Sequence, residues 1–123
     1  MDLAITLPRE TRGTWLLTAE GEIDIASAPR LRDQLLAALG LEPALPVTLD
    51  MAGVTFLDST GLAALVEVHR LAGEGGRRLC LLSPRRSVRR ILHLTQLDAL
   101  LEVHPDLDAA LTTLQPLGDD LPT

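Results

Sequence analysis

The sequence predicts an α/β fold: one domain with a mixed, mostly parallel β-sheet, an N-terminal hairpin and about four packed helices. The chain has 123 residues, the length of one domain, and 46% of them are hydrophobic, enough for an ordinary core. After the hairpin, β-prone and helix-like runs alternate, which requires crossover connections and therefore parallel strands. We expect the domain to span residues 1–115, and the acidic, proline-bearing residues 116–123 to form a flexible tail.

The N-terminal segment predicts a β-hairpin. Leu3–Leu7 is a short strand candidate that Pro8 ends, Arg9–Gly13 is expected to be the turn, and Thr14–Ala19 is the second strand. The stretch Gly21–Asp24 then leaves that strand. The apolar residues of this hairpin offer a surface through which two copies of the chain could form a homodimer.

A helix and a buried strand are predicted next. Ser27 and Pro29 are typical of a helix cap and first turn, leucines recur at helical spacing after them, and Gly40 closes the helix. Val47–Met51 is nearly continuous in apolar character, which is typical of a strand buried on both faces of a parallel sheet.

The second half of the chain continues the alternation of helices and strands. A wide apolar helical pattern covers Leu62–Glu74 and ends at a group of glycines. Arg78–Leu82 is predicted as a strand, Val88–Leu94 as a third helix and Leu100–Val103 as a short strand. Pro105 and the residue after it open a fourth helix.

The segment Asp58-Ser59-Thr60-Gly61 lies where the third strand gives way to the second helix. Asp58 is a candidate N-cap, because its carboxylate can accept hydrogen bonds from the unpaired N–H groups of the first turn. Gly61 keeps side-chain bulk away from that turn. The hydroxyls of Ser59 and Thr60 stand beside a positive helix end, where a phosphate would be well placed. The alternative is a helix cap without a further role.

Composition excludes several classes of function. The chain has no lysine, so it holds neither a Walker A motif nor a Schiff-base lysine. The single cysteine, Cys80, lies in an apolar run and is expected to be buried, and one cysteine fits a reducing compartment. The sequence shows no signal-peptide pattern and no apolar run long enough to span a bilayer. We therefore expect a cytoplasmic protein that does not insert into membranes.

The charged and titratable residues suggest no cofactor or metal. The histidines, His69, His93 and His104, are not paired with Cys, Asp or Glu at ligand spacing, so we expect no metal site, and no motif supports a bound cofactor. No nucleophile-elbow motif favours a hydrolase. The net charge of −6 argues against direct nucleic-acid binding. The third helix carries a cluster of arginines that is either a solvated face or a contact for an acidic partner.

Three segments together resemble the STAS domain, in the form found in anti-sigma factor antagonists. They are Gly21–Asp24 before a capped helix, Val54–Leu62, which contains the Asp58–Gly61 segment, and Leu82–Pro84 with the helix that ends near Leu97. The resemblance covers residues 3–115 and implies a single STAS-like domain. It departs from the family pattern at Thr60, where many members have a second serine, and at Gln96, a position usually given to glycine.

The resemblance implies a phosphorylation-dependent switch rather than a catalyst. Members of this family bind an anti-sigma factor that is also an ATP-dependent serine kinase, and binding frees the sigma factor. The kinase then phosphorylates the serine after the aspartate, here Ser59, the modified form no longer binds, and a phosphoserine phosphatase resets it. The implied partner-binding residues are Glu22, Asp24, Asp58, Ser59, Thr60, Gly61 and Leu62. For Glu22 and Asp24 the alternative is an ordinary acidic turn.

A second function within the same family remains open from the sequence. The domain could act as a STAS scaffold or ligand-sensing module in a signalling assembly or a lipid-transport complex. A neighbouring gene for a kinase-like anti-sigma factor would favour the switch, and transporter subunits would favour the scaffold.

Overall fold

Strands β3 (Thr14–Ile23) and β4 (Val47–Leu57) form the parallel centre of the sheet in the computed structural model, which describes residues 2–114. On one side β4 pairs in parallel with β5 (Leu79–Leu82), and β5 pairs in parallel with β6 (Glu102–His104). On the other side two short strands, β1 (Ala4–Ile5) and β2 (Arg9–Thr11), pair antiparallel with β3, so the sheet order is β1-β3-β4-β5-β6, with β2 also on β3. The prediction of a mixed, mostly parallel sheet is confirmed.

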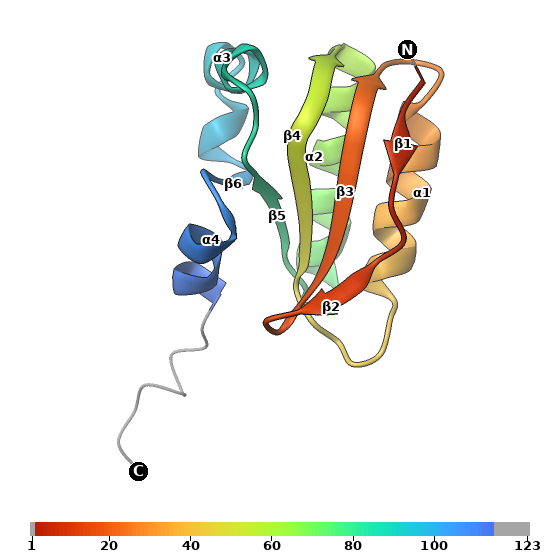
Figure 1. The fold of residues 1–123 in the computed structure, drawn as a ribbon, viewed down its shortest axis with the longest axis vertical. Helices are drawn as coiled ribbons and strands as arrows, with labels where there is room; N and C mark the ends of the chain where they lie inside the picture. The colour runs from red at the N-terminus through yellow and green to blue at the C-terminus, as the bar shows by residue number, and fades with distance from the viewer. Residues whose placement is uncertain (1, 115–123) are drawn as a thin grey trace.

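Within residues 2–114, four α-helices pack on the two faces of this sheet, and the sequence predicted about four packed helices. Figure 1 shows α1 (Ala28–Leu39) and α2 (Ser59–Glu74) behind the central strands. The buried side chains of α3 (Arg86–Leu94) belong to the same hydrophobic core as those of α1 and α2. Helix α4 (Leu107–Leu114) packs against the opposite face of β5. No helix within residues 2–114 has the length and apolar character needed to cross a membrane.

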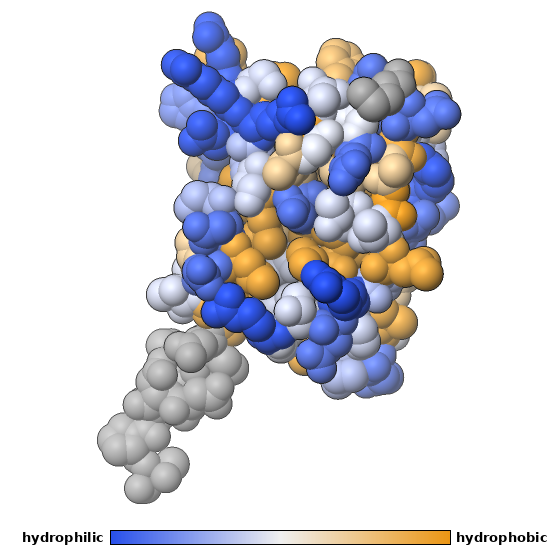
Figure 2. All heavy atoms as spheres, in the orientation of Figure 1, coloured by the Kyte–Doolittle hydropathy of each residue, from blue (hydrophilic) through white to orange (hydrophobic). Residues whose placement is uncertain are grey.

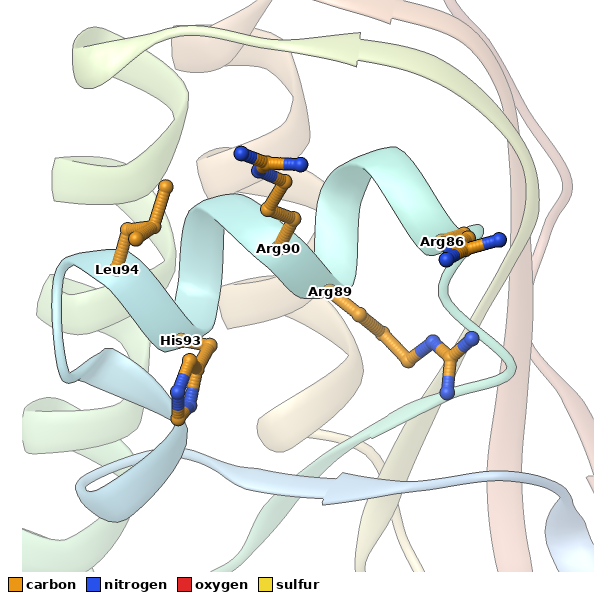
Figure 3. A pocket seen from close by; sticks show the side chains of 5 residues that line it. All are labelled: Arg86, Arg89, Arg90, His93 and Leu94. Atoms are coloured by element: carbon orange, nitrogen blue, oxygen red, sulfur yellow. The ribbon is translucent and has the colours of Figure 1, made fainter.

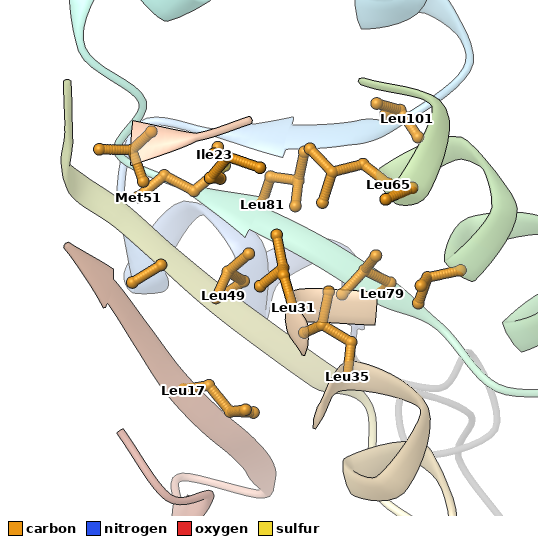
Figure 4. Close-up of a cluster of buried hydrophobic side chains, with 14 of the residues drawn as sticks. Leu17, Ile23, Leu31, Leu35, Leu49, Met51, Leu65, Leu79, Leu81 and Leu101 are labelled. Atoms are coloured by element: carbon orange, nitrogen blue, oxygen red, sulfur yellow. The ribbon is translucent and has the colours of Figure 1, made fainter. Parts of the chain in front are cut away.

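The main hydrophobic core lies between the sheet and α1, α2 and α3 and is almost entirely aliphatic (Figure 4). Alternation along β5 divides its residues between the faces: Leu79 and Leu81 enter the main core, and Cys80 and Leu82 enter a smaller cluster with Ala110 of α4. Figure 2 shows the face that carries α4, where apolar residues lie among polar ones. Cys80 is fully buried, as predicted from its apolar run.

The hairpin forms, but its turn is shorter than predicted. Beyond Pro8 the edge strand resumes as β2 (Arg9–Thr11), and this strand pairs with β3, so only Arg12 and Gly13 turn the chain. Both turn residues have positive φ, 50° and 82°, the combination that matches the twist of a two-residue hairpin. Proline interrupts the edge because it has no N–H to donate, and it does not end the pairing. The edge is therefore made of β1 (Ala4–Ile5) and β2.

The two central strands run further than their predicted ends. β3 continues through Gly21–Ile23, which we expected to leave the sheet, and β4 continues beyond Met51 to Leu57. The register of the pair shifts twice, between Thr18 and Glu20 and between Gly21 and Glu22. Gly21 has φ +116°, and a Cβ there would collide with the Asp2 carbonyl. These irregularities break the apolar pattern that the sequence prediction used.

The C-terminal part differs from prediction by a few residues. A short 3-10 helix, Leu97–Ala99, which the sequence did not predict, delays the last strand, so it spans Glu102–His104 instead of Leu100–Val103. Gln96 precedes this turn with φ +62°, the left-handed conformation for which glycine is suited. The predicted tail, residues 116–123, lies outside the described residues.

Replacing Gln96 with glycine is expected to stabilise the protein. The left-handed conformation at φ +62° is strained for a side chain with a Cβ, and glycine removes that strain. The expected gain is about 0.5–1 kcal/mol in the free energy of unfolding, measured by urea denaturation. Gln96→Ala is the control: it removes the amide but keeps the Cβ and should give no such gain. Equal stabilisation by both variants would contradict this explanation.

Candidate functional site

Two loops meet at the carboxyl edge of the central strands. In the β3–β4 register Ile23 lies opposite Leu57, so the loop that follows β3 and the turn into α2 begin side by side. The backbone N–H of Asp58 donates to the carbonyl of Ile23 at 3.1 Å and ties the two together. The structure thus joins two of the segments that carried the family resemblance in the sequence.

The N-terminus of α2 is capped as predicted. Asp58 is extended (φ −97°, ψ −175°), and its Oδ1 accepts from the Gly61 N–H at 2.9 Å. The N–H groups of Ser59 and Thr60 donate to no acceptor among the described residues 2–114. One aspartate therefore satisfies one donor of the first turn and leaves two at the positive end of the helix dipole.

Gly61 is buried at the contact between α2 and β3. A Cβ at this position would lie 2.6 Å from Ile23 Cγ2, 2.6 Å from Leu57 Cδ1 and 3.1 Å from the Ile23 carbonyl oxygen. The absence of a side chain here admits Ile23 and Leu57 of the same chain, and a contact of Gly61 with a partner stays a prediction. Its role in the site is to let the first turn of α2 approach β3 closely.

Ser59 and Thr60 differ in accessibility. Ser59 is exposed, whereas Thr60 is half-buried in a hollow of about 220 Å³ between α1 and α2. Arg32 and Glu67 line the same hollow and form an ion pair that links the two helices. Leu62 is half-buried and packs against the core. Ser59 is therefore the hydroxyl of this segment that an enzyme can reach most directly.

The loop after β3 is held by its own hydrogen bonds. Oδ1 of Asp24 accepts from the N–H groups of Ala26 and Ser27, each at 3.0 Å. The Ser27 hydroxyl donates to the Glu22 carbonyl at 2.9 Å. The Ser27 N–H, by donating to the Asp24 carboxylate, lowers the pKa of that group. Asp24 thus fixes the loop, and Glu22, which is partly exposed, lies in β3 beside it.

Two exposed apolar side chains lie at the carboxyl edge of β3 and β4, and neither was predicted from the sequence to bind a partner. Ile25 in the loop is 74% exposed, and Phe56, next to last in β4, is 47% exposed. Large apolar side chains exposed beside polar ones are a feature of protein-binding surfaces. The signal available in the sequence was the apolar Ile25 inside an otherwise polar turn.

The arginine cluster of α3 lies outside this corner. Figure 3 shows Arg90 and Leu94 projecting from one side of the helix and Arg89 and His93 from another. The cluster consists of Arg85, directly before α3, and Arg86, Arg89 and Arg90 within it. Arg85 donates to the Ala52 carbonyl at 2.8 Å, while the three arginines within the helix have no ion pair with the described residues. This cluster is a solvated surface in the isolated chain, and a role for it in partner contact stays a prediction.

Comparison with known proteins identifies the family. Residues 7–110 match the family model of the STAS domain. The chain belongs to the STAS domain family. It is 24% identical over 115 residues to the anti-sigma F factor antagonist of Paenibacillus polymyxa, an alignment that covers 94% of this chain and 97% of that protein. The family resemblance found in the sequence is confirmed.

Solved structures share the fold of this STAS domain. An anti-sigma factor antagonist from Mycobacterium paratuberculosis matches with a TM-score of 0.78 and 30% identity, over 92% of this chain and 96% of that one. The Bacillus cell fate determinant SpoIIAA in its phosphorylated form matches with a TM-score of 0.64 and 21% identity, over 89% and 99% of the two chains.

Two glycines of α2 provide a matched test of the contact at Gly61. Gly61→Ala is expected to destabilise the protein by about 1–3 kcal/mol, because Ile23 and Leu57 must move to admit the methyl group. Gly73→Ala, in the same helix with no atom within 4 Å of the added Cβ, should stabilise by up to about 1 kcal/mol. Thermal and urea unfolding measure both. Effects of the same sign would contradict the role assigned to Gly61.

The Asp58 cap gives a second test. Asp58→Ala removes the acceptor of the Gly61 N–H and is expected to lower the free energy of unfolding by about 1 kcal/mol. Asp58→Asn keeps a good capping oxygen and should stay within about 0.5 kcal/mol of the unmodified protein. Thermal and urea unfolding of the two variants measure this difference. Equal losses of unfolding free energy in Asp58→Ala and Asp58→Asn would show that Asp58 contributes its charge and not its capping oxygen.

Proposed function

We propose that this STAS domain is an anti-sigma factor antagonist that binds an anti-sigma serine kinase and so frees its sigma factor. Phosphorylation of Ser59 ends the binding, and a phosphoserine phosphatase restores it. The observation that carries this proposal is the exposed Ser59 hydroxyl at a capped helix N-terminus, in a chain whose relatives are named for that role.

The fold is suited to accept a phosphate at Ser59. The N–H groups of Ser59 and Thr60 have no other acceptor among residues 2–114, and the dipole of α2 is positive at this end. A negative group there is favoured by about 0.3–1 kcal/mol, which offsets part of the repulsion from the neighbouring Asp58. Phosphorylation should therefore leave the domain folded.

The same phosphate is unfavourable in a bound complex. A phosphoserine carries about −1.5 to −2 charges at neutral pH, and it would be added at the same edge of the sheet as the exposed Ile25 and Phe56 and the loops that carry Asp24 and Asp58. Burying this charge against a partner costs desolvation, and an unfavourable charge contact at an interface is worth several kcal/mol. Binding is affected more strongly than folding, which is what a switch requires.

Ser59 is a better phosphate acceptor than Thr60. Thr60 is half-buried in the hollow lined by the Arg32–Glu67 ion pair, which a phosphate would have to disturb, whereas Ser59 is exposed and does not line that hollow. The proposed contact surface consists of Glu22, Asp58, Ser59, Thr60 and Leu62, with Ile25 and Phe56 added from the structure. Asp24 and Gly61 shape it from beneath.

The test compares Ser59→Asp with Ser59→Ala in binding to the anti-sigma kinase of the same genome. Ser59→Ala should bind as the unmodified protein does, and Ser59→Asp about a hundredfold more weakly or worse, measured by calorimetry. Ser87→Asp is the matched control, since Ser87 is also an exposed serine in the first turn of a helix, α3.

Mass spectrometry after incubation with that kinase and ATP should find phosphate on the Ser59 peptide. Equal binding by the Ser59 variants, with each of them folded, would remove Ser59 from the mechanism. Absence of any binding to the kinase would instead favour a STAS scaffold or sensing module.

A further inference from the structure

Three side chains with metal-binding atoms converge on the face of the sheet that carries α4. Cys80 of β5 lies directly opposite Glu102 of β6 in the parallel register, and His104 follows two residues later, on the same face as Glu102. One sulfur, one carboxylate oxygen and one imidazole nitrogen all lie within 4.8 Å of one another. From the sequence we expected no metal site, because no histidine is paired with Cys, Asp or Glu at ligand spacing. The β5–β6 register brings Cys80 to Glu102 and His104, and the sequence does not show that register.

We propose that Cys80, Glu102 and His104 bind a Zn²⁺ ion, with solvent in the fourth position. The set of one sulfur, one nitrogen and one oxygen suits zinc and not Mg²⁺ or Ca²⁺, which take oxygen ligands. Ligands of a tetrahedral zinc ion lie roughly 3.3–3.8 Å apart, so atoms that now lie within 4.8 Å of one another need to approach by about 1 Å at most. Glu102 and His104 are both partly exposed, so their side chains can make that movement.

The surroundings already orient these ligands. Arg78 donates to both oxygens of Glu102 and, at 2.9 Å, to the Thr113 carbonyl in the last turn of α4. The Thr113 hydroxyl lies 3.4 Å from Nε2 of His104. A carboxylate has about four lone-pair positions, so Arg78 leaves Glu102 able to bind a cation as well. Hydrogen-bonded ligands of this kind are usual around protein metal ions.

Access to the proposed site is provided by His104. It lines a hollow of about 510 Å³ together with Ser83, Pro84 and Val103, so an ion can reach its imidazole from solvent. Cys80 is fully buried and does not itself line this hollow; burial raises the pKa of its thiol to about 12, and its proton must leave to solvent when the sulfur binds a cation. The bound ion would link β5 to the three-residue edge strand β6. The site is formed by β5 and β6 and shares no residue with the Ser59 corner, so this proposal does not depend on the proposed function.

The experiment titrates the purified full chain with Co²⁺, which reports sulfur ligation through a thiolate-to-cobalt charge-transfer absorption, and then with Zn²⁺. One equivalent of Co²⁺ should produce this band, Zn²⁺ should remove it, and Mg²⁺ should not. Zn²⁺ should also raise the midpoint of thermal unfolding. Cys80→Ala should abolish the band, and His104→Gln should weaken Zn²⁺ binding at least tenfold.

His93→Gln is the matched control, because His93 also faces a carboxylate, with Nδ1 3.0 Å from Asp98 Oδ2, but on the surface of α3 and the 3-10 helix Leu97–Ala99. This variant should bind Zn²⁺ like the unmodified protein. The proposal is overturned if stoichiometric Co²⁺ gives no charge-transfer band, or if His93→Gln weakens binding as much as His104→Gln. Should Cys80→Ala fail to fold, the band in the unmodified protein and the two histidine variants still decide the outcome.

Discussion

The close contact between the first turn of α2 and the end of β3 is the constraint on which the functional corner depends. Gly61 lies against Ile23 and Leu57, both almost fully buried, and the Asp58 N–H reaches the Ile23 carbonyl. Burying two such apolar side chains contributes a few kcal/mol, against about 1 kcal/mol for the hydrogen bond. Packing therefore holds the two loops together, and the hydrogen bond fixes how they are aligned.

This arrangement suits a switch that changes charge and leaves shape unaltered. Asp24 and Asp58 are already engaged with backbone N–H groups of their own loops, so each loop is fixed before a partner arrives. A phosphate on Ser59 meets free N–H donors in the isolated domain but would face desolvation inside a complex. The favourable interaction with the helix end is worth about 1 kcal/mol or less, whereas the unfavourable charge in a complex costs several kcal/mol. Phosphorylation is therefore expected to weaken binding much more than it changes the stability of the domain.

The sequence predicted what is encoded locally and missed what depends on register. The Asp58 cap and the alternation of strands and helices follow from neighbouring residues, and both are confirmed. The continuation of β3 through Gly21 could not be predicted, because it requires bulges that break the period-two pattern. Besides the nearby Leu57, Gly61 lies against Ile23, a residue distant in the sequence, and the β3–β4 pairing brings Ile23 to this position. The convergence of Cys80 with His104 has the same origin in β5–β6.

The proposed switch is tested most directly by residue-by-residue amide hydrogen exchange in the unmodified and the Ser59-phosphorylated protein. The measurement covers the loop after β3 and the turn from β4 into α2. If the switch acts by charge on a fixed surface, the amides of Asp58 and Gly61, which donate to Ile23 and Asp58, keep the same protection in both forms. Loss of protection at these two amides on phosphorylation would mean that the corner opens, and that the switch is a change of conformation instead.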